Sequence, residues 1–318
     1  MEDLLVKYGI GLGRRFSQNQ KKEFLVAISQ EFTQLGYPIK FANDEKRGSR
    51  HSTNLFIGNI AAAKTIIFTH YDTGSHILWP NFKYYPLHGE KSMKTWRNAT
   101  LIPPLVLTLI AIAATTVLMN TIELNGQTRQ ILLTGLVFFG LLGISYLATG
   151  FGNRYNLNKN TASVLALLEI AKKLSAEDRD KIAFMLVDHG NGDNMGAQMI
   201  RLALPTTYDK RLFVFLDCIG RGDNVRIGYV ANLAINARKM KENYKGKKQI
   251  DTLECDTKRT IYKPTYFLPQ SMTVSCGNLD ENKELTVGGI NTGKDNYVET
   301  ENIYDIAEMI TRTFANKN

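Results

Sequence analysis

The sequence contains few cysteines, and none is placed to form a structural cross-link. Cys218, Cys255 and Cys276 are widely separated in the 318 residues, and no Cys-x-x-Cys pair is present. This spacing excludes a disulfide framework and a thiolate zinc site, and it fits a reducing compartment. The first residues, MEDLLVKYGIGLGRRF, hold only a short apolar stretch with acidic residues at its start, so we expect no signal peptide.

Acidic residues are outnumbered, and the formal net charge is +9. Such a balance favours an acidic partner, either nucleic acid or an anionic membrane surface. The sequence lacks any run of Arg and Lys interleaved with aromatics, so we expect no nucleic-acid module. A chain of this length could form one large α/β domain or two smaller ones.

Two long stretches lack charged residues altogether. Residues 98–122 and 130–153 contain no Asp, Glu, Lys or Arg. About 20 apolar residues at a rise of 1.5 Å span roughly 30 Å, which is the thickness of a bilayer core. With a short polar link between them, they predict a helical hairpin with membrane spans at about 101–120 and 131–149. The alternative is a pair of buried core helices.

The flanks of this predicted hairpin resemble a membrane boundary. Tyr84, Tyr85 and Trp96 precede the first span, where interfacial aromatics are common. The outer flanks are basic, with Lys83, Lys91, Lys94 and Arg97 before the hairpin and Arg154 and Lys159 after it. We therefore expect a multi-pass cell-membrane protein with its main domain on the cytoplasmic side. That domain is predicted to be discontinuous, 1–79 with 154–318, and 80–153 is the inserted hairpin with its flank.

Hydrophobic patterns outside the hairpin predict alternating strands and helices. We expect helices at 18–35, 161–174, 195–203 and 303–314, and a basic helix and loop at 231–248. Strands are expected at 54–58, 65–69, 182–187, 212–216, 225–230 and 272–275. This order predicts an α/β fold with a mostly parallel mixed sheet flanked by helices on both faces. Functional residues should lie at the carboxyl ends of the strands, where His70, Asp188 and Asp217 stand.

Several segments, taken in order, resemble the co-catalytic di-zinc aminopeptidases, metallopeptidase family 28, which includes the glutaminyl cyclases. They are Arg14 to Tyr37, Ile66 to Thr73 with the tetrad His70-Tyr71-Asp72-Thr73, Asn158 to Val164, Val187 to Ala197, Leu216 to Gly220 and Asn291 to Asp295. The resemblance covers the chain except roughly residues 80–153. It implies a zinc-aminopeptidase fold whose site holds two zinc ions, a bridging carboxylate and a Glu that acts as general base.

The resemblance also assigns individual positions. His70 matches a ligand of the first zinc, Asp217 a ligand of the second, and Asp72 the carboxylate that orients His70. Four other positions are substituted: Lys159 stands for the bridging Asp, Gly190 for the general base, Asn191 for the neighbouring Glu ligand and Asn291 for the last His. Since residues that would bind zinc directly and the base are gone, this pattern indicates a degenerate zinc site and no cofactor.

Lys159 has two interpretations. Its ammonium could form an ion pair with Asp217 and neutralise carboxylates that a metal once held, because unpaired buried carboxylates are costly. Alternatively, Lys159 points to solvent at a helix start, with Asn160 or Thr161 as the cap.

Other residues offer weaker routes to chemistry. The five histidines are His51, His70, His76, His88 and His189, so none near Asn291 can replace the missing ligand. A shifted single-metal site could combine His70, Asp72 and His76 with Asp188 and His189. Cys218 lacks a nucleophile-elbow motif and is predicted to be a buried thiol.

These patterns favour a membrane-anchored, catalytically inactive peptidase-like protein. It would bind a peptide, a lipid or a protein partner through the former cleft. One alternative is an active aminopeptidase or related amide hydrolase with an atypical or single-metal site. The other is an accessory subunit of a membrane transport or peptide-processing complex that docks through the hairpin. The sequence leaves the oligomeric state open.

Overall fold

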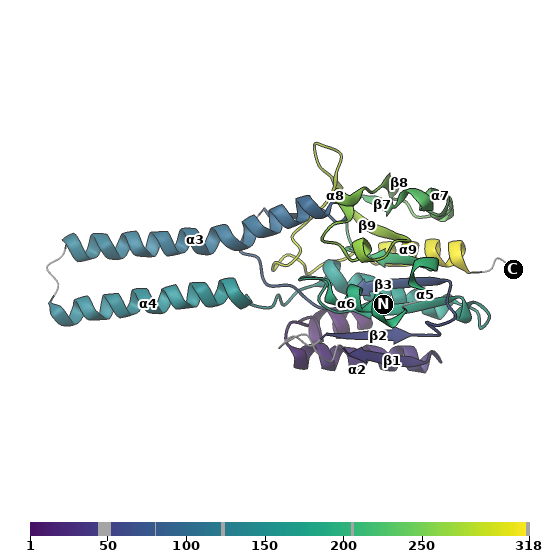
Figure 1. Ribbon diagram of the computed structural model, residues 1–318, viewed down its shortest axis with the longest axis horizontal. Helices are drawn as coiled ribbons and strands as arrows, with labels where there is room; N and C mark the ends of the chain where they lie inside the picture. Colours follow the sequence, from purple (N-terminus) through teal and green to yellow (C-terminus); the bar gives the residue numbers. More distant parts are fainter. Residues whose placement is uncertain (44–51, 80, 122–124, 205–206, 316–318) are drawn as a thin grey trace.

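A mixed β-sheet forms the centre of the molecule (Figure 1). The computed structural model describes residues 1–318 except 44–51, 80, 122–124, 205–206 and 316–318. The strands within the described residues are β1 (Ile39–Asn43), β2 (Thr53–Ile57), β3 (Thr65–His70), β4 (Lys83–Tyr84), β5 (Ile182–Val187), β6 (Leu212–Leu216), β7 (Asn224–Tyr229), β8 (Gln249–Glu254), β9 (Ser271–Leu279) and β10 (Leu285–Gly288).

The centre of the sheet is parallel and its two ends are antiparallel. The strand order is β1-β2-β5-β3-β6-β9-β10-β4, and β7 and β8 extend the sheet from β9. Strands β5, β3, β6 and β9 run parallel, whereas β1, β2, β10 and β4 pair antiparallel with their neighbours. The predicted mixed α/β sheet is confirmed. Its parallel centre places the carboxyl ends of β3, β5 and β6 at one edge.

Helices cover both faces of this sheet. The body contains α1 (Glu2–Leu5), α2 (Gln18–Gln34), α5 (Ala162–Lys173), α6 (Met195–Ala203), α7 (Ala234–Asn243), α8 (Thr257–Thr260) and α9 (Thr300–Phe314). Two π-helices, η1 (Val6–Gly11) and η2 (Leu157–Thr161), and the short 3-10 helices η3 (Asp178–Asp180), η4 (Tyr208–Lys210), η5 (Ala231–Leu233) and η6 (Pro264–Phe267) complete the described set.

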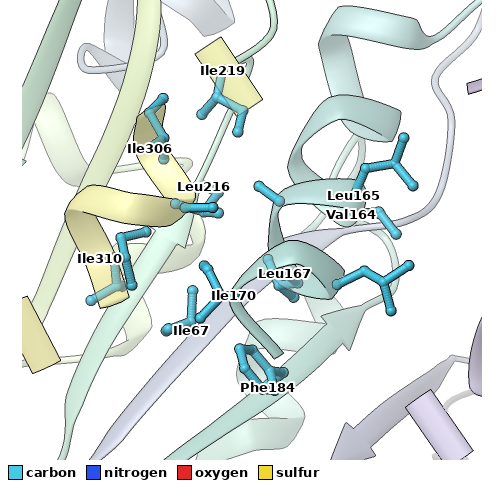
Figure 2. Packing of buried hydrophobic residues seen from close by; sticks show 14 of the residues in the cluster. Ile67, Val164, Leu165, Leu167, Ile170, Phe184, Leu216, Ile219, Ile306 and Ile310 are labelled. Carbon is cyan, nitrogen blue, oxygen red and sulfur yellow. The ribbon is translucent and has the colours of Figure 1, made fainter. Parts of the chain in front are cut away.

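Side chains that alternate between the two faces of the sheet pack into two hydrophobic cores. On β3, Ile67 packs into the core that α5 and α9 cover, as Figure 2 shows, while Ile66 and Phe68 face the opposite core with Ile200 of α6. All four side chains are fully buried. Burying such a side chain contributes roughly 1.5–3 kcal/mol, so this alternation fixes the register of β3 and with it the position of His70.

Two long helices project from the body as a hairpin (Figure 1). They are α3 (Gly89–Thr121) and α4 (Gly126–Thr149), and both contain a segment long and apolar enough to cross a membrane. Only 6% of the apolar window of α3 and 0% of that of α4 is buried, so these are not core helices of the body. α3 continues through Pro103 and Pro104. It begins at Gly89, shortly after β4, and therefore earlier than the span predicted to start at about residue 101.

The end of α4 is tied to the loop that follows the tetrad. Ser75 forms a β-bridge with Gly152, and the His76 N–H donates to the Phe151 carbonyl at 2.6 Å. The Tyr146 hydroxyl donates to the His76 carbonyl at 2.9 Å. The hairpin is therefore joined directly to the segment that carries His70 and Asp72.

Candidate functional site

The polar edge of the sheet is built by three strand ends. β3 ends at His70, and Asp188 and Asp217 follow the last residues of β5 and β6. His70, Asp188 and Asp217 are 4%, 0% and 1% exposed. The predicted placement at strand ends is confirmed, and it concentrates titratable groups in a buried region.

Lys159 joins this region from η2. Its side chain is 4% exposed, and its Nζ lies 2.9 Å from Oδ1 of Asp217. The interpretation that Lys159 points to solvent is therefore wrong. The π-helical turn of η2 carries the ammonium inward to the position that the resemblance assigns to a bridging carboxylate.

Asp295, rather than Asn160 or Thr161, caps this turn. One carboxylate oxygen of Asp295 accepts from the N–H of Asn158 at 2.8 Å and the other from the N–H of Lys159 at 3.3 Å. The Asn160 amide instead donates to the Asp72 carbonyl. Burial raises the pKa of Asp295 to about 7, although these N–H groups and nearby cations oppose the shift.

Tyr84 and Lys263 complete the cluster around Asp217. The Tyr84 hydroxyl donates to Oδ2 of Asp217 at 2.5 Å and accepts from Nζ of Lys263 at 2.7 Å. The ammonium groups of Lys159 and Lys263 lie 4.1 and 4.0 Å from the centroid of the Tyr84 ring, within the range of cation–π attraction. The sequence predicts Tyr84 at the membrane interface. Its hydroxyl instead points into the body, at Asp217.

The charges in this cluster stabilise one another. Burial alone would raise the pKa of Asp217, but Lys159 and Lys263 lower it to about 2. Burial opposes the charge of Lys159, yet Asp217 raises the pKa of Lys159 well above its ordinary value. Among the described residues Lys263 makes no such direct carboxylate contact, and burial lowers its pKa to about 7. The cluster therefore contains one strongly held ion pair and one lysine that loses its proton easily.

Asp72 is bonded to the turn after β5. It accepts from the N–H groups of Gly190 at 2.8 Å and Asn191 at 3.2 Å. Burial opposes the charge, but His70, Lys21 and these N–H groups lower the pKa of Asp72. The buried Nδ1 of His70 has no hydrogen-bond partner among the described residues, so Asp72 does not accept a hydrogen bond from that nitrogen.

Gly190 leaves room for the His70 ring. A Cβ built on Gly190 would lie 1.8 Å from Nδ1 of His70. The imidazole therefore occupies the volume that the side chain of a general-base residue would need. Burial lowers the pKa of His70 to about 4, which keeps the ring neutral at physiological pH.

A cavity of about 300 Å³ opens onto these residues. It is lined by His70, Phe82, Tyr84, Gly89, Ser92, Met93, Trp96, Lys159, Gly190, Asn191, Gly192, Asp193, Tyr262, Lys263, Pro264 and Asn291. Asn191 and Asn291, two of the substituted ligand positions, thus face the same cavity as His70. Oδ1 of Asn291 is buried with no hydrogen-bond partner in the described part of the chain. The first turns of α3 form one wall, so the cavity lies where the hairpin leaves the body.

The side chains present do not suit a zinc centre. Within the described residues, no group of three His, Cys, Asp or Glu side chains could hold a metal ion. Both oxygens of Asp217 already bind Lys159 and Tyr84. The same holds for the shifted set of His70, Asp72, His76, Asp188 and His189, which forms no such group in the described part of the chain, and Oδ1 of Asp188 lies 2.6 Å from Nζ of Lys21. His51 lies outside the described residues.

Cys218 is a fully buried thiol, as expected. Its Sγ lies 3.3 Å from Oδ1 of Asp217. Burial and the neighbouring carboxylate raise its pKa well above the ordinary value. A thiolate is therefore disfavoured at this position.

Solved structures with the same fold are zinc enzymes and cyclases. The glutaminyl cyclase of Bacteroides thetaiotaomicron, solved with N-acetylhistamine bound, matches with a TM-score of 0.55 at 13% identity over 99% of this chain and 96% of that one. A Zn-dependent exopeptidase of Parabacteroides distasonis matches with a TM-score of 0.57 at 13% identity, covering 96% and 94% of the two chains. The chain has the fold of these enzymes.

The glutaminyl cyclase of Porphyromonas gingivalis gives a similar result, with a TM-score of 0.57 at 11% identity over 97% of this chain and 94% of that one. No protein-family model matches the sequence, and no curated protein matches it. At this level of identity, the likeness establishes the glutaminyl cyclase and zinc exopeptidase fold, and the chemistry has to be argued from the residues of this chain.

Proposed function

We propose that this chain is a membrane-anchored protein of the zinc-exopeptidase fold that does not catalyse zinc-dependent hydrolysis and binds a peptide in its cleft. The observation that carries the proposal is the 2.9 Å contact between Nζ of Lys159 and Asp217. A lysine ammonium between the former ligand positions repels divalent cations. Gly190 offers no proton acceptor in place of the missing base.

Membrane anchoring is supported by the hairpin. Large apolar side chains along α3 and α4 are exposed, among them Leu107 at 59%, Ile110 at 59% and Phe139 at 65%. Exposed apolar surface of this extent is rare on soluble monomers, whereas in lipid it needs no other cover. Lys159 is buried and does not belong to the basic flank, but the exposed Lys83, Lys94, Arg97 and Arg154 still favour a cytoplasmic body.

A peptide fits the composition of the cavity. Trp96, Tyr262 and Met93 provide apolar and aromatic surface, and the amide side chain of Asn291 provides a polar group. Pockets that combine an apolar lining with a few directed polar groups are typical ligand sites. The unpartnered Oδ1 of Asn291 in particular suits a peptide N–H.

The two tryptophans allow a direct test of binding. Trp96 lines the cavity, whereas Trp79 does not. We expect peptides selected from a random library against the purified full chain in detergent to change its tryptophan fluorescence. The change should persist in W79F and disappear in W96F. Equal responses in both variants would place the binding elsewhere and contradict the proposal.

Turnover assays test the inactive part of the proposal. The full chain should neither cleave aminoacyl anilides nor cyclise N-terminal glutaminyl peptides, with or without added zinc. Turnover that H70A abolishes would favour the active hydrolase instead.

A further inference from the structure

A second cavity lies at the junction of body and hairpin, away from the cleft. It has a volume of about 400 Å³. Arg14, from the segment before α2, and Arg154, just after α4, both line it, together with His76 and Asn153. Both arginine side chains are exposed. The backbones of these segments meet here, since a Cβ on Gly13 would lie 3.0 Å from the Arg154 carbonyl oxygen.

This basic cavity adjoins an apolar groove between α3 and α4. The groove has a volume of about 560 Å³ and is lined by apolar side chains such as Leu107 and Leu142. Leu78, Tyr146 and Phe151 line both spaces. On α3 the groove runs from Pro104 to Ile112, which is about 12 Å along the axis at 1.5 Å per residue.

The two adjoining spaces are therefore ordered from a basic one at the body to an apolar one along the hairpin. The two arginines stand at the end near the body, where the membrane surface would lie, and the apolar lining runs outward along both helices. Arginine binds phosphate oxygens with paired, charge-assisted hydrogen bonds. We propose that the basic cavity and the adjoining groove together bind one anionic phospholipid, with its phosphate at Arg14 and Arg154 and an acyl chain in the groove between α3 and α4. The site rests on the proposed insertion of the hairpin in a membrane.

The junction is rigid enough to form a specific site. The Ser75–Gly152 bridge and the bond from Tyr146 to the His76 carbonyl fix the wall that the two spaces share. Gly150, between them, has φ +66°, and a Cβ there would lie 2.3 Å from Oγ of Ser75. A bound lipid would therefore contact the same loop that joins the hairpin to the tetrad.

Lipid retention by the full chain tests this site. The chain is reconstituted in nanodiscs containing phosphatidylcholine with or without phosphatidylglycerol, and retained lipid is counted by native mass spectrometry after release into detergent. We expect one phosphatidylglycerol per chain. R14Q/R154Q should weaken retention roughly 100-fold, because each charge-assisted arginine–phosphate contact that is lost contributes about a factor of ten.

A matched double variant distinguishes a specific lipid site from general electrostatic attraction to the membrane. Lys94 and Arg97 are exposed on the first turns of α3 and line neither space. K94Q/R97Q should leave retention within about twofold. Equal losses in both double variants, or equal retention of phosphatidylcholine, would overturn the proposal.

A second pair tests the groove without altering charge. Gly140 lines the groove and Gly135 does not, and a Cβ on either meets no described atom within 4 Å. G140L should displace the lipid and G135L should not. Displacement of the lipid by soluble glycerol phosphate would show a phosphate site without an acyl groove and would contradict the proposal.

Membrane extraction distinguishes the two ways in which the proposal could fail. If alkaline carbonate releases the wild-type chain from membranes, the membrane anchoring itself is wrong. If the chain stays in the membrane but R14Q/R154Q and G140L retain lipid like the wild type, only the lipid site is wrong.

Discussion

Lys159 is the residue that most distinguishes this cleft from a zinc site. It is a buried cation balanced by Asp217, and the Tyr84 ring lies against it. Removing one partner of a buried pair leaves the other charge uncompensated, whereas removing both can be nearly neutral. The stability of the cluster should therefore depend on charge balance more than on either residue alone.

The first prediction uses this asymmetry. K159M should lower the free energy of unfolding by about 3 kcal/mol, and K159M/D217N should recover most of the loss. Urea unfolding of the full chain in detergent measures both. The exposed pair Lys173–Glu308, with side chains 36% and 36% exposed, is the control, and K173M should cost less than about 1 kcal/mol. A K159M chain as stable as the wild type would contradict the buried-pair account.

Gly190 gives a second prediction. G190A should destabilise the fold by about 1–3 kcal/mol, because its Cβ collides with the His70 ring. G192A is the matched control, since the nearest atom to a Cβ there is 3.8 Å away. H70A/G190A should be more stable than G190A alone. If G190A and G192A unfold alike, the imidazole does not occupy the former base position.

Lys263 gives a prediction in pH. Burial lowers the pKa of Lys263 to about 7, from an ordinary value of 10.5. Below pH 7 the amine is protonated in both states. At higher pH the unfolded chain keeps the proton and the folded chain does not, so stability rises with pH.

Relative to K263M, the wild-type chain should therefore gain roughly 1 kcal/mol per pH unit between pH 7 and 9. Unfolding titrations across that range measure the difference. K22M, which removes an exposed lysine, controls for general loss of positive charge. A difference that stays constant with pH would show that Lys263 remains charged in the folded protein.

At the scale of elements, the sequence pattern predicts the long apolar strands at the centre of the sheet and misses short or polar ones near its ends. β3, β5 and β6 are runs of apolar residues, and their predicted bounds lie within one residue of the observed ones. β1, β4, β8 and β10 were not predicted. β1 and β8 carry mixed polar sequences along exposed edges, and β4 has only two residues. Their pairing depends on neighbours distant in the sequence, which local periodicity does not record.

The hairpin gives a prediction at this scale. Gln127, at the outer end of α4, and Ala176, in the body, are both exposed, while Cys218 and Cys276 are buried. In a C255S background, an impermeant maleimide added to intact cells should label Q127C and not A176C. After lysis, both should react. Labelling of both variants in intact cells, or of neither, would contradict a hairpin that crosses the membrane with a cytoplasmic body.

At the scale of the whole molecule, the site combines residues that the sequence separates widely. His70, Asp72, Lys159 and Asp217 could be assigned from the resemblance because each follows or opens a recognisable element. Tyr84 and Lys263 could not, since neither stands in a motif, and only the folded chain brings them to Asp217. The first turns of α3 also close the cavity, which makes the cleft and the hairpin one structural unit.

The proposed function requires that the Lys159 ammonium stands in place of a metal ion beside Asp217. Its most direct test is the zinc content of the full chain, purified in detergent after growth with added zinc and measured by elemental analysis. We expect substoichiometric zinc in the wild type and the same amount in H70A. K159M alone should not gain zinc. Stoichiometric zinc in the wild type that H70A removes would contradict this requirement.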